Sequence, residues 1–202
     1  MAAETTRSSL LLKVRDPANQ ASWRAFDARY RDLILRFCRA RRLQPADAED
    51  VRQLVMMGLA RSLPRFVYQR DRGRFRDYLG RVVRHAVTRY LECPAASRRA
   101  LGGEALDALP DPKAEPSDDA WEREWTHHHF RLALERCRDE VTPQTLAIFE
   151  RLVVGSSPAD VATAFGVSVA SVYKIKQRVR NRLKTFIAEQ VRAEEKAIEL
   201  VG

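Results

Sequence analysis

The sequence predicts an all-α fold of two small helical domains joined by a flexible acidic linker. Apolar residues recur at helical spacing through most of the chain. No stretch alternates apolar and polar residues for long enough to predict a sheet. Over residues 94–120 the composition changes to alanine, glycine, proline and acidic residues, as in a linker. We therefore expect one domain at 1–93, a second at 121–190, and a helical tail at 191–202.

The N-terminal domain is expected to contain three amphipathic helices. The first lies between Ser22 and Arg41 and has aromatic and aliphatic residues at helical spacing. The second begins near Pro45, a residue that a first helical turn tolerates, and should end before Pro64. A basic loop at 65–74 precedes the third helix. The apolar stripe of this third helix is Phe75, Tyr78, Leu79, Val82, Val83, Ala86, Val87 and Tyr90.

The C-terminal domain is expected to contain four helices. The first should run from about Trp121 to about Glu140. Thr142 and Pro143 are typical of a helix start, and they predict a second helix that continues through Val154. Two more helices follow.

The sharpest local pattern lies between Ser157 and Leu183. Ala162 is small enough for a second helix to cross closely, and Gly166 can adopt the positive φ that a tight turn between helices requires. Ser168 is placed to cap the following helix. The shared core is expected to be Val161, Phe165, Val167 and Val172. This register predicts a DNA-binding helix-turn-helix.

The polar face of the last helix carries the candidate DNA contacts. A stripe of apolar residues, with Val172 and Val179 among them, is expected to be buried. Side chains near the start of such a helix reach base edges, whereas other cations hold phosphates. A basic helix that only packs on its neighbour is the alternative. The candidates are Ser168, Ser171, Lys174, Lys176, Gln177, Arg178 and Arg182.

The charge balance favours a polyanionic partner. The formal net charge is +9 and the pI is near 9.9, which suits nucleic acid or an anionic membrane surface. No apolar run approaches the roughly 20 residues that cross a bilayer, and the first residues lack the apolar stretch of a secretory signal. Cys38, Cys93 and Cys137 are scattered, which fits a reducing compartment. We expect a cytoplasmic protein without membrane insertion.

The chain resembles the extracytoplasmic-function sigma factors, which direct bacterial RNA polymerase and keep two domains called region 2 and region 4. The segment DAEDVRQLVMMGLARSLPRF, at 47–66, resembles the region 2 helix that docks on the clamp helices of the polymerase. The segment FRDYLGRVVRHAVTRYL, at 75–91, resembles the helix next to the −10 element. Residues 141–183 resemble region 4, whose recognition helix reads the −35 element.

This resemblance implies that the partners are promoter DNA and core RNA polymerase, through its β and β′ subunits, with an anti-sigma factor as a further candidate. It places the polymerase contacts at Asp47, Asp50, Val51 and Gln53. These carboxylates have a simpler alternative role, since acidic residues stabilise the N-terminus of a helix. It places the −10 contacts at Arg70, Arg72, Arg74, Arg81, Arg84, His85 and Thr88.

No catalytic site, metal site or cofactor is expected. The only cluster that suggests one is His127, His128 and His129, but consecutive histidines point around a helix. Only His129 and Cys137 could share a face, and zinc would need further ligands. The alternative to a sigma factor is a stand-alone helix-turn-helix regulator that binds duplex DNA without polymerase.

Overall fold

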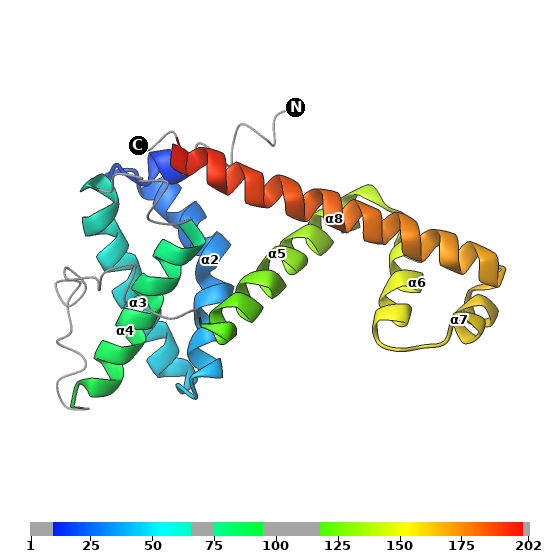
Figure 1. Cartoon of the computed structure of the whole chain (residues 1–202), viewed down its shortest axis with the longest axis horizontal. Coiled ribbons are helices and arrows are strands. Elements are labelled where there is room, and N and C mark those ends of the chain that lie inside the picture. The colour runs from blue at the N-terminus through cyan, green and yellow to red at the C-terminus, as the bar shows by residue number, and fades with distance from the viewer. Residues whose placement is uncertain (1–9, 66–74, 95–117, 200–202) are drawn as a thin grey trace. The chain divides into compact units, whose positions relative to one another are not determined.

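Helices form the regular structure of this protein in a computed structural model that describes residues 10–65, 75–94 and 118–199 (Figure 1). No strand occurs in these ranges, and the predicted all-α class is confirmed. The elements are α2 (Gln20–Ala40), α3 (Pro45–Ser62), the 3-10 turn η1 (Leu63–Arg65), α4 (Phe75–Glu92), α5 (Asp119–Glu140), α6 (Pro143–Val153), α7 (Pro158–Phe165) and α8 (Val169–Glu199).

The chain divides into two compact units. Unit 1 comprises residues 1–126 and 192–202, and unit 2 comprises residues 127–191. Most of the expected linker, and the loop with Arg70, Arg72 and Arg74, lie outside the described residues. Within the described ranges, no helix is both long enough and apolar enough to cross a membrane.

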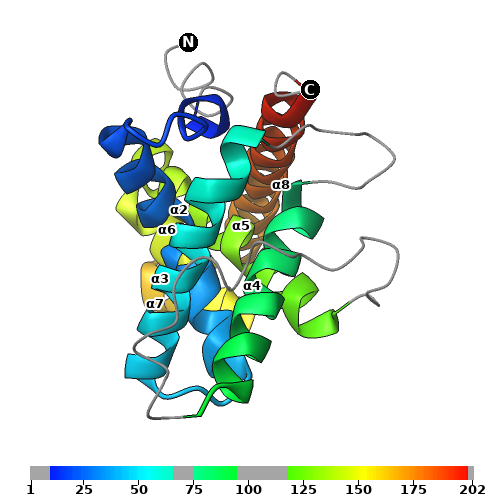
Figure 2. The same cartoon turned by 90° about the vertical axis from the view of Figure 1, so that its left-hand side faces the viewer.

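In unit 1, α2, α3 and α4 lie side by side around one apolar core (Figure 2). Asn19 caps α2, because its side-chain oxygen accepts a hydrogen bond from the Ser22 amide at 3.1 Å. Pro45 occupies the first turn of α3, as the sequence predicts, and Pro64 lies in η1 after the helix has ended. All eight residues of the expected apolar stripe of α4 are buried.

The start of α5 belongs to unit 1, which differs from the expected boundary near residue 120. Trp121 is 1% exposed and Trp125 is 6% exposed, and both join the core of α2, α3 and α4. Trp121 meets Phe37 edge-on at 5.4 Å between ring centroids. Its Nε1 donates a hydrogen bond to the Arg76 carbonyl oxygen at 3.2 Å. The two tryptophans therefore complete the N-terminal core.

The end of α8 also contributes to unit 1, through a buried carboxylate. Glu194 Oε1 accepts a hydrogen bond from Tyr30 Oη at 2.9 Å and from an Arg29 guanidinium nitrogen at 3.0 Å. Burial and this carboxylate raise the pKa of the Tyr30 phenol. A buried carboxylate with no such donors would be strongly destabilising, so the pairing explains how Glu194 is tolerated there. The expected tail is thus helical through Glu199 and begins within unit 1.

Unit 2 is formed by the rest of α5, by α6 and α7, and by α8 through Val191. Thr142 caps α6 and Ser157 caps α7, each accepting a hydrogen bond from a backbone amide three residues later. One small core joins α6, α7 and the start of α8 through Ile148, Val161 and Val172. A second core joins α5 to the middle of α8.

Candidate nucleic-acid interface

The acidic start of α3 is held by a tyrosine from α4. Tyr90 Oη donates to Asp47 Oδ1 at 2.6 Å and lies 3.3 Å from Asp50 Oδ2. Burial, together with these two carboxylates, raises the pKa of Tyr90, so the phenol stays protonated as a donor. The two predicted partner-facing aspartates therefore have a fixed orientation. The sequence does not reveal this link, because Tyr90 is 40 residues or more from both.

The exposed face of α3 differs from the expected set at one position. Val51 is completely buried in the core, so its side chain is not available to a protein partner. Asp50 and Gln53 are exposed, and Asp47 is half-buried. Met57, one turn beyond Gln53, is 41% exposed and continues the same stripe. Met57 was not among the predicted polymerase contacts, because it lies within the apolar run of α3, where the sequence pattern does not indicate which residues are exposed.

Ion pairs link α3 to α2. Arg52 donates to Glu49 Oε2 at 2.7 Å and to Asp27 Oδ1 at 2.5 Å, and Arg31 pairs with Glu49 as well. The Arg52 hydrogen bond lowers the pKa of Glu49. Glu49 thus bridges two helices, whereas Asp50 on the next position remains exposed.

The predicted −10 contacts on α4 are only partly at the surface. Thr88 is exposed, and Arg84 and His85 are half-buried. Arg81 is 9% exposed, so its guanidinium is not placed for an open phosphate contact in this structure. Helical periodicity does not explain this burial, because Arg81 is not part of the apolar stripe of α4. Arg70, Arg72 and Arg74 lie outside the described residues.

In unit 2, α7 and α8 are joined by the tight turn that the sequence predicts. Gly166 ends α7 in the left-handed conformation, with φ +63° and ψ +36°. Ser168 Oγ accepts a hydrogen bond from the Ser171 amide at 3.1 Å and so caps α8. Val172 is fully buried against the α6 and α7 core. The turn, the cap and the buried residue are all confirmed.

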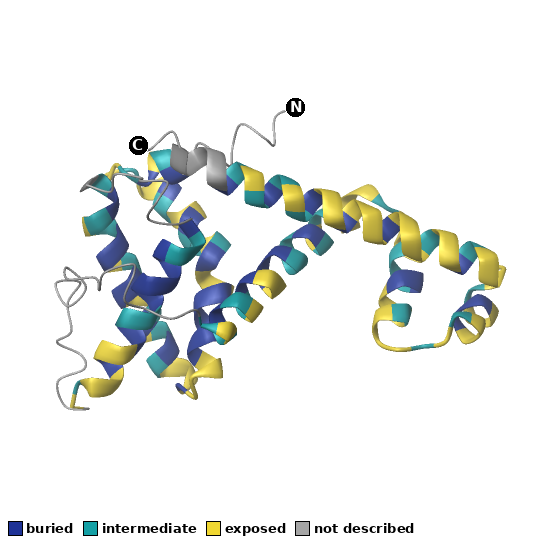
Figure 3. Ribbon diagram, viewed as in Figure 1, coloured by how far each residue is buried: buried dark blue, intermediate teal, exposed yellow. Residues whose placement is uncertain are grey.

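Figure 3 shows that much of α8 is exposed, and the exposed residues of its first half include several cations. Most of the predicted contacts are exposed, namely Ser168, Lys174, Lys176, Gln177 and Arg178, and Ser171 is half-buried. From Val161 to Ala188 the sequence has six lysines and arginines and no acidic residue. This stretch therefore presents a positive potential without internal neutralisation.

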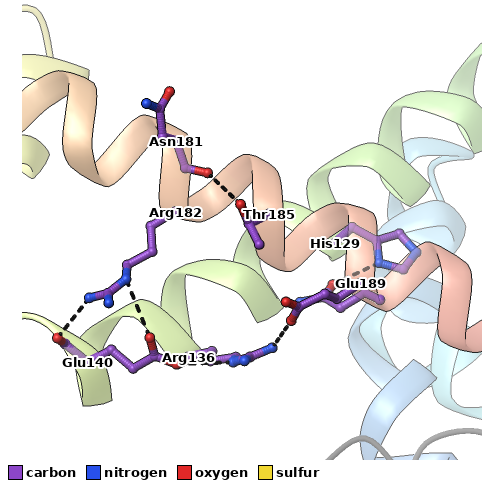
Figure 4. Close-up of polar contacts among 8 residues, drawn as sticks. His129, Arg136, Glu140, Asn181, Arg182, Thr185 and Glu189 are labelled. Atoms are coloured by element: carbon purple, nitrogen blue, oxygen red, sulfur yellow. Dashed lines mark hydrogen bonds and ion pairs between the residues drawn. The ribbon is translucent and has the colours of Figure 1, made fainter.

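Arg182, a predicted phosphate contact, also has partners within unit 2. Its side chain donates to the Glu140 backbone oxygen at 3.1 Å and pairs with the Glu140 carboxylate at 3.4 Å (Figure 4). It thereby satisfies the C-terminal end of α5, where helix carbonyls lack internal donors. Arg136 extends the same network by pairing with Glu189 at 2.5 Å. Arg182 therefore stabilises unit 2, and its side chain is also exposed to solvent.

Two of the three consecutive histidines are buried in the structure, whereas His127 is exposed. His128 and His129 are each 2% exposed, and His129 Nδ1 lies at hydrogen-bond distance, 2.9 Å, from the buried Gln190 amide. No group of three or more metal-ligating side chains is found among the described residues.

A comparison with known families bears on the first unit. Residues 26–94 match the family model of sigma-70 region 2. This region 2 segment takes in most of α2 and all of α3, η1 and α4, including the Asp47, Asp50 and Tyr90 cluster. The likeness is to sigma-70 region 2 and covers this segment of the chain. Trp121, Trp125 and Glu194 lie outside the matched segment, although they pack into the same unit. Comparison with curated proteins gives no significant match.

Proposed function

We propose that this protein is a sigma factor of the extracytoplasmic-function type, which binds core RNA polymerase and directs it to promoters with −10 and −35 elements. The observation that carries the proposal is the region 2 match over residues 26–94, where the exposed stripe of α3 and the polar side of α4 occur together.

The polymerase surface is the stripe formed by Asp50, Gln53 and Met57, with Asp47 beside it. The stripe combines carboxylates, an amide and a flexible apolar side chain, which suits a protein surface better than a phosphate backbone. The Tyr90 hydrogen bonds hold the aspartates in place before binding, which lowers the ordering cost of the complex.

Promoter DNA is engaged by two separate surfaces. Thr88, Arg84 and His85 on α4 lie toward the −10 element, and α8 enters the major groove of the −35 duplex. Support for the second surface comes from the capped start of α8, the tight turn at Gly166 and the run of cations without acidic residues.

Transcription of a promoter library with purified core enzyme tests the proposal. The full chain should produce promoter-specific starts that core enzyme alone does not, and their absence would refute the proposal. Binding to immobilised core enzyme separates a sigma factor from a stand-alone regulator, because a regulator would bind duplex DNA equally well without polymerase.

A matched pair of variants locates the polymerase surface. Met57→Ser should weaken core binding about tenfold, as expected for an apolar anchor worth about 1–2 kcal/mol. Asp32→Asn changes an exposed residue of α2 away from the stripe and should leave core binding unchanged. Equal effects of the two variants on core binding would contradict the assignment of polymerase binding to this stripe.

A further inference from the structure

Two apolar side chains are exposed beside the cations of α8. Val169 is 40% exposed and Tyr173 is 55% exposed. They are four residues apart, so they lie on the same side of the helix, and Ala170 between them is also exposed. The adjacent side of the helix carries Val172, which is completely buried. The apolar stripe formed by Val169, Ala170 and Tyr173 is therefore not part of the core of unit 2.

The surroundings of this apolar stripe indicate what would cover it. Single exposed apolar residues are ordinary, whereas neighbours on one face of a cationic helix mark a binding surface. The cations Lys174, Lys176 and Arg178 follow the stripe directly, and no acidic residue occurs between Val161 and Ala188. Charge complementarity thus favours a polyanion whose surface also offers apolar groups. Duplex DNA is such a partner, because thymine carries a methyl group in the major groove.

We propose that Val169, Ala170 and Tyr173 read the C5-methyl groups of thymines in the base pairs that face the first turns of α8. The inference rests on the proposed function, in which α8 lies in the major groove of duplex DNA. It adds which chemical group of the DNA is recognised by the side of α8 that carries Val169 and Tyr173. Among the four bases only thymine presents a methyl group there, so apolar contact at this point distinguishes thymine from cytosine.

The same flank continues with a side chain that suits adenine. Gln177 lies four residues after Tyr173 and is exposed, and its Nε2 donates to Asn181 Oδ1 at 3.0 Å. A glutamine amide can make a bidentate contact with adenine N6 and N7. Lys174 and Arg178 lie on the other flank and suit guanine. The helix is therefore expected to select A·T pairs on the Tyr173 side and G·C pairs on the Arg178 side.

The test compares thymine with deoxyuridine, which pairs identically and lacks only the methyl group. The full-length protein, alone and with core RNA polymerase, first selects duplexes from a randomised pool. Each thymine of the selected duplex is then replaced singly by deoxyuridine. At one or two positions the replacement should weaken wild-type binding roughly fourfold, the effect of one methyl group that is no longer buried.

Variants assign the contact to a side chain. Tyr173→Ala should abolish the difference between thymine and deoxyuridine at one of these positions, and Tyr173→Phe should retain it, because the ring is kept. Lys176→Ala is the matched control, since loss of a phosphate contact weakens both duplexes alike and lowers the salt slope by about 0.9. Tyr173 is exposed, so its variants leave the core of unit 2 intact, and the wild-type comparison needs no variant.

The outcomes separate this inference from the proposed function. A selected duplex that binds equally with thymine and deoxyuridine at every position overturns the methyl contact and leaves DNA binding by α8 in place. Failure to enrich any duplex, with or without core enzyme, overturns both. If Tyr173→Ala weakens binding to core enzyme in the absence of DNA, with no thymine sensitivity in the wild type, the apolar stripe faces protein and the inference is wrong.

Discussion

Gly80 lies against the indole of Trp121, and its substitution by alanine tests how α5 is built into unit 1. A Cβ at position 80 would lie 2.6 Å from Trp121 Nε1 and 2.8 Å from Trp121 Cε2. Trp121 is 1% exposed, so its ring cannot shift without losing core contacts. Overpacking of this kind costs about 1–3 kcal/mol, and alanine regains about 1 kcal/mol of helix propensity. We expect Gly80→Ala to lower the free energy of unfolding of unit 1 by up to about 2 kcal/mol.

Removal of the indole should reverse the sign of this effect. Trp121→Ala by itself should cost about 3–5 kcal/mol, since it empties a large buried site. In that background the added methyl group meets no ring, so Gly80→Ala should be neutral or stabilising by up to about 1 kcal/mol. Trp121→Leu provides a milder background if the alanine variant does not fold.

Urea unfolding followed by tryptophan fluorescence measures these differences. The chain has three tryptophans, Trp23, Trp121 and Trp125, and all three lie in unit 1. Fluorescence therefore reports on unit 1. Circular dichroism at 222 nm reports on both units, because every helix contributes to that signal, and agreement of the two probes tests for a single transition. If Gly80→Ala destabilises unit 1 equally with and without the indole, the close approach of α4 and α5 described above is wrong.

Three further predictions follow from single sites. Gly166→Ala should destabilise unit 2 by about 1 kcal/mol from its positive φ alone, because no atom lies within 4 Å of the added Cβ; thermal unfolding by circular dichroism checks this. Burial raises the pKa of Cys38 to about 12, so a thiol reagent should label Cys93, which is half-buried, well before Cys38; equal labelling rates would contradict the burial. The Arg52 hydrogen bond lowers the pKa of Glu49, so its stabilising effect is present above its usual pKa of 4.5 and is lost as pH falls through the lower folded value. Acid titrations of stability should therefore be shallower for Glu49→Gln than for the wild type.

Several features of the site could be predicted from the sequence because they depend on neighbouring residues. The turn at Gly166 and the cap at Ser168 are set by dihedral preference and by a hydrogen bond that spans three residues. The buried stripe of α4 follows from helical periodicity. The exposure of Lys174 and Arg178 follows from the same periodicity on α8.

Two site residues were misplaced because a resemblance to a family segment does not determine how deeply each side chain is buried. Arg81 and Val51 both occur in segments that resemble partner-binding helices, yet both are buried. Tyr173 belongs to neither the expected apolar stripe nor the expected contacts of the last helix, and it is 55% exposed. The contacts of the exposed Arg182 with the end of α5 could not be predicted either, because Glu140 is 42 residues away in the sequence.

The sequence by itself determined the helices, their caps, the turn before α8 and the cationic character of its outer face. Tertiary structure alone decided that Trp121 and Trp125 complete the N-terminal core, and that Glu194 is buried against Tyr30 and Arg29. The physical reason is separation along the chain. Caps and turns are fixed by interactions within a few residues, whereas Trp121 meets Arg76 across 45 residues and Glu194 meets Tyr30 across 164. Such partners are selected by the shape and charge of a packed surface, which exists only after the helices have come together.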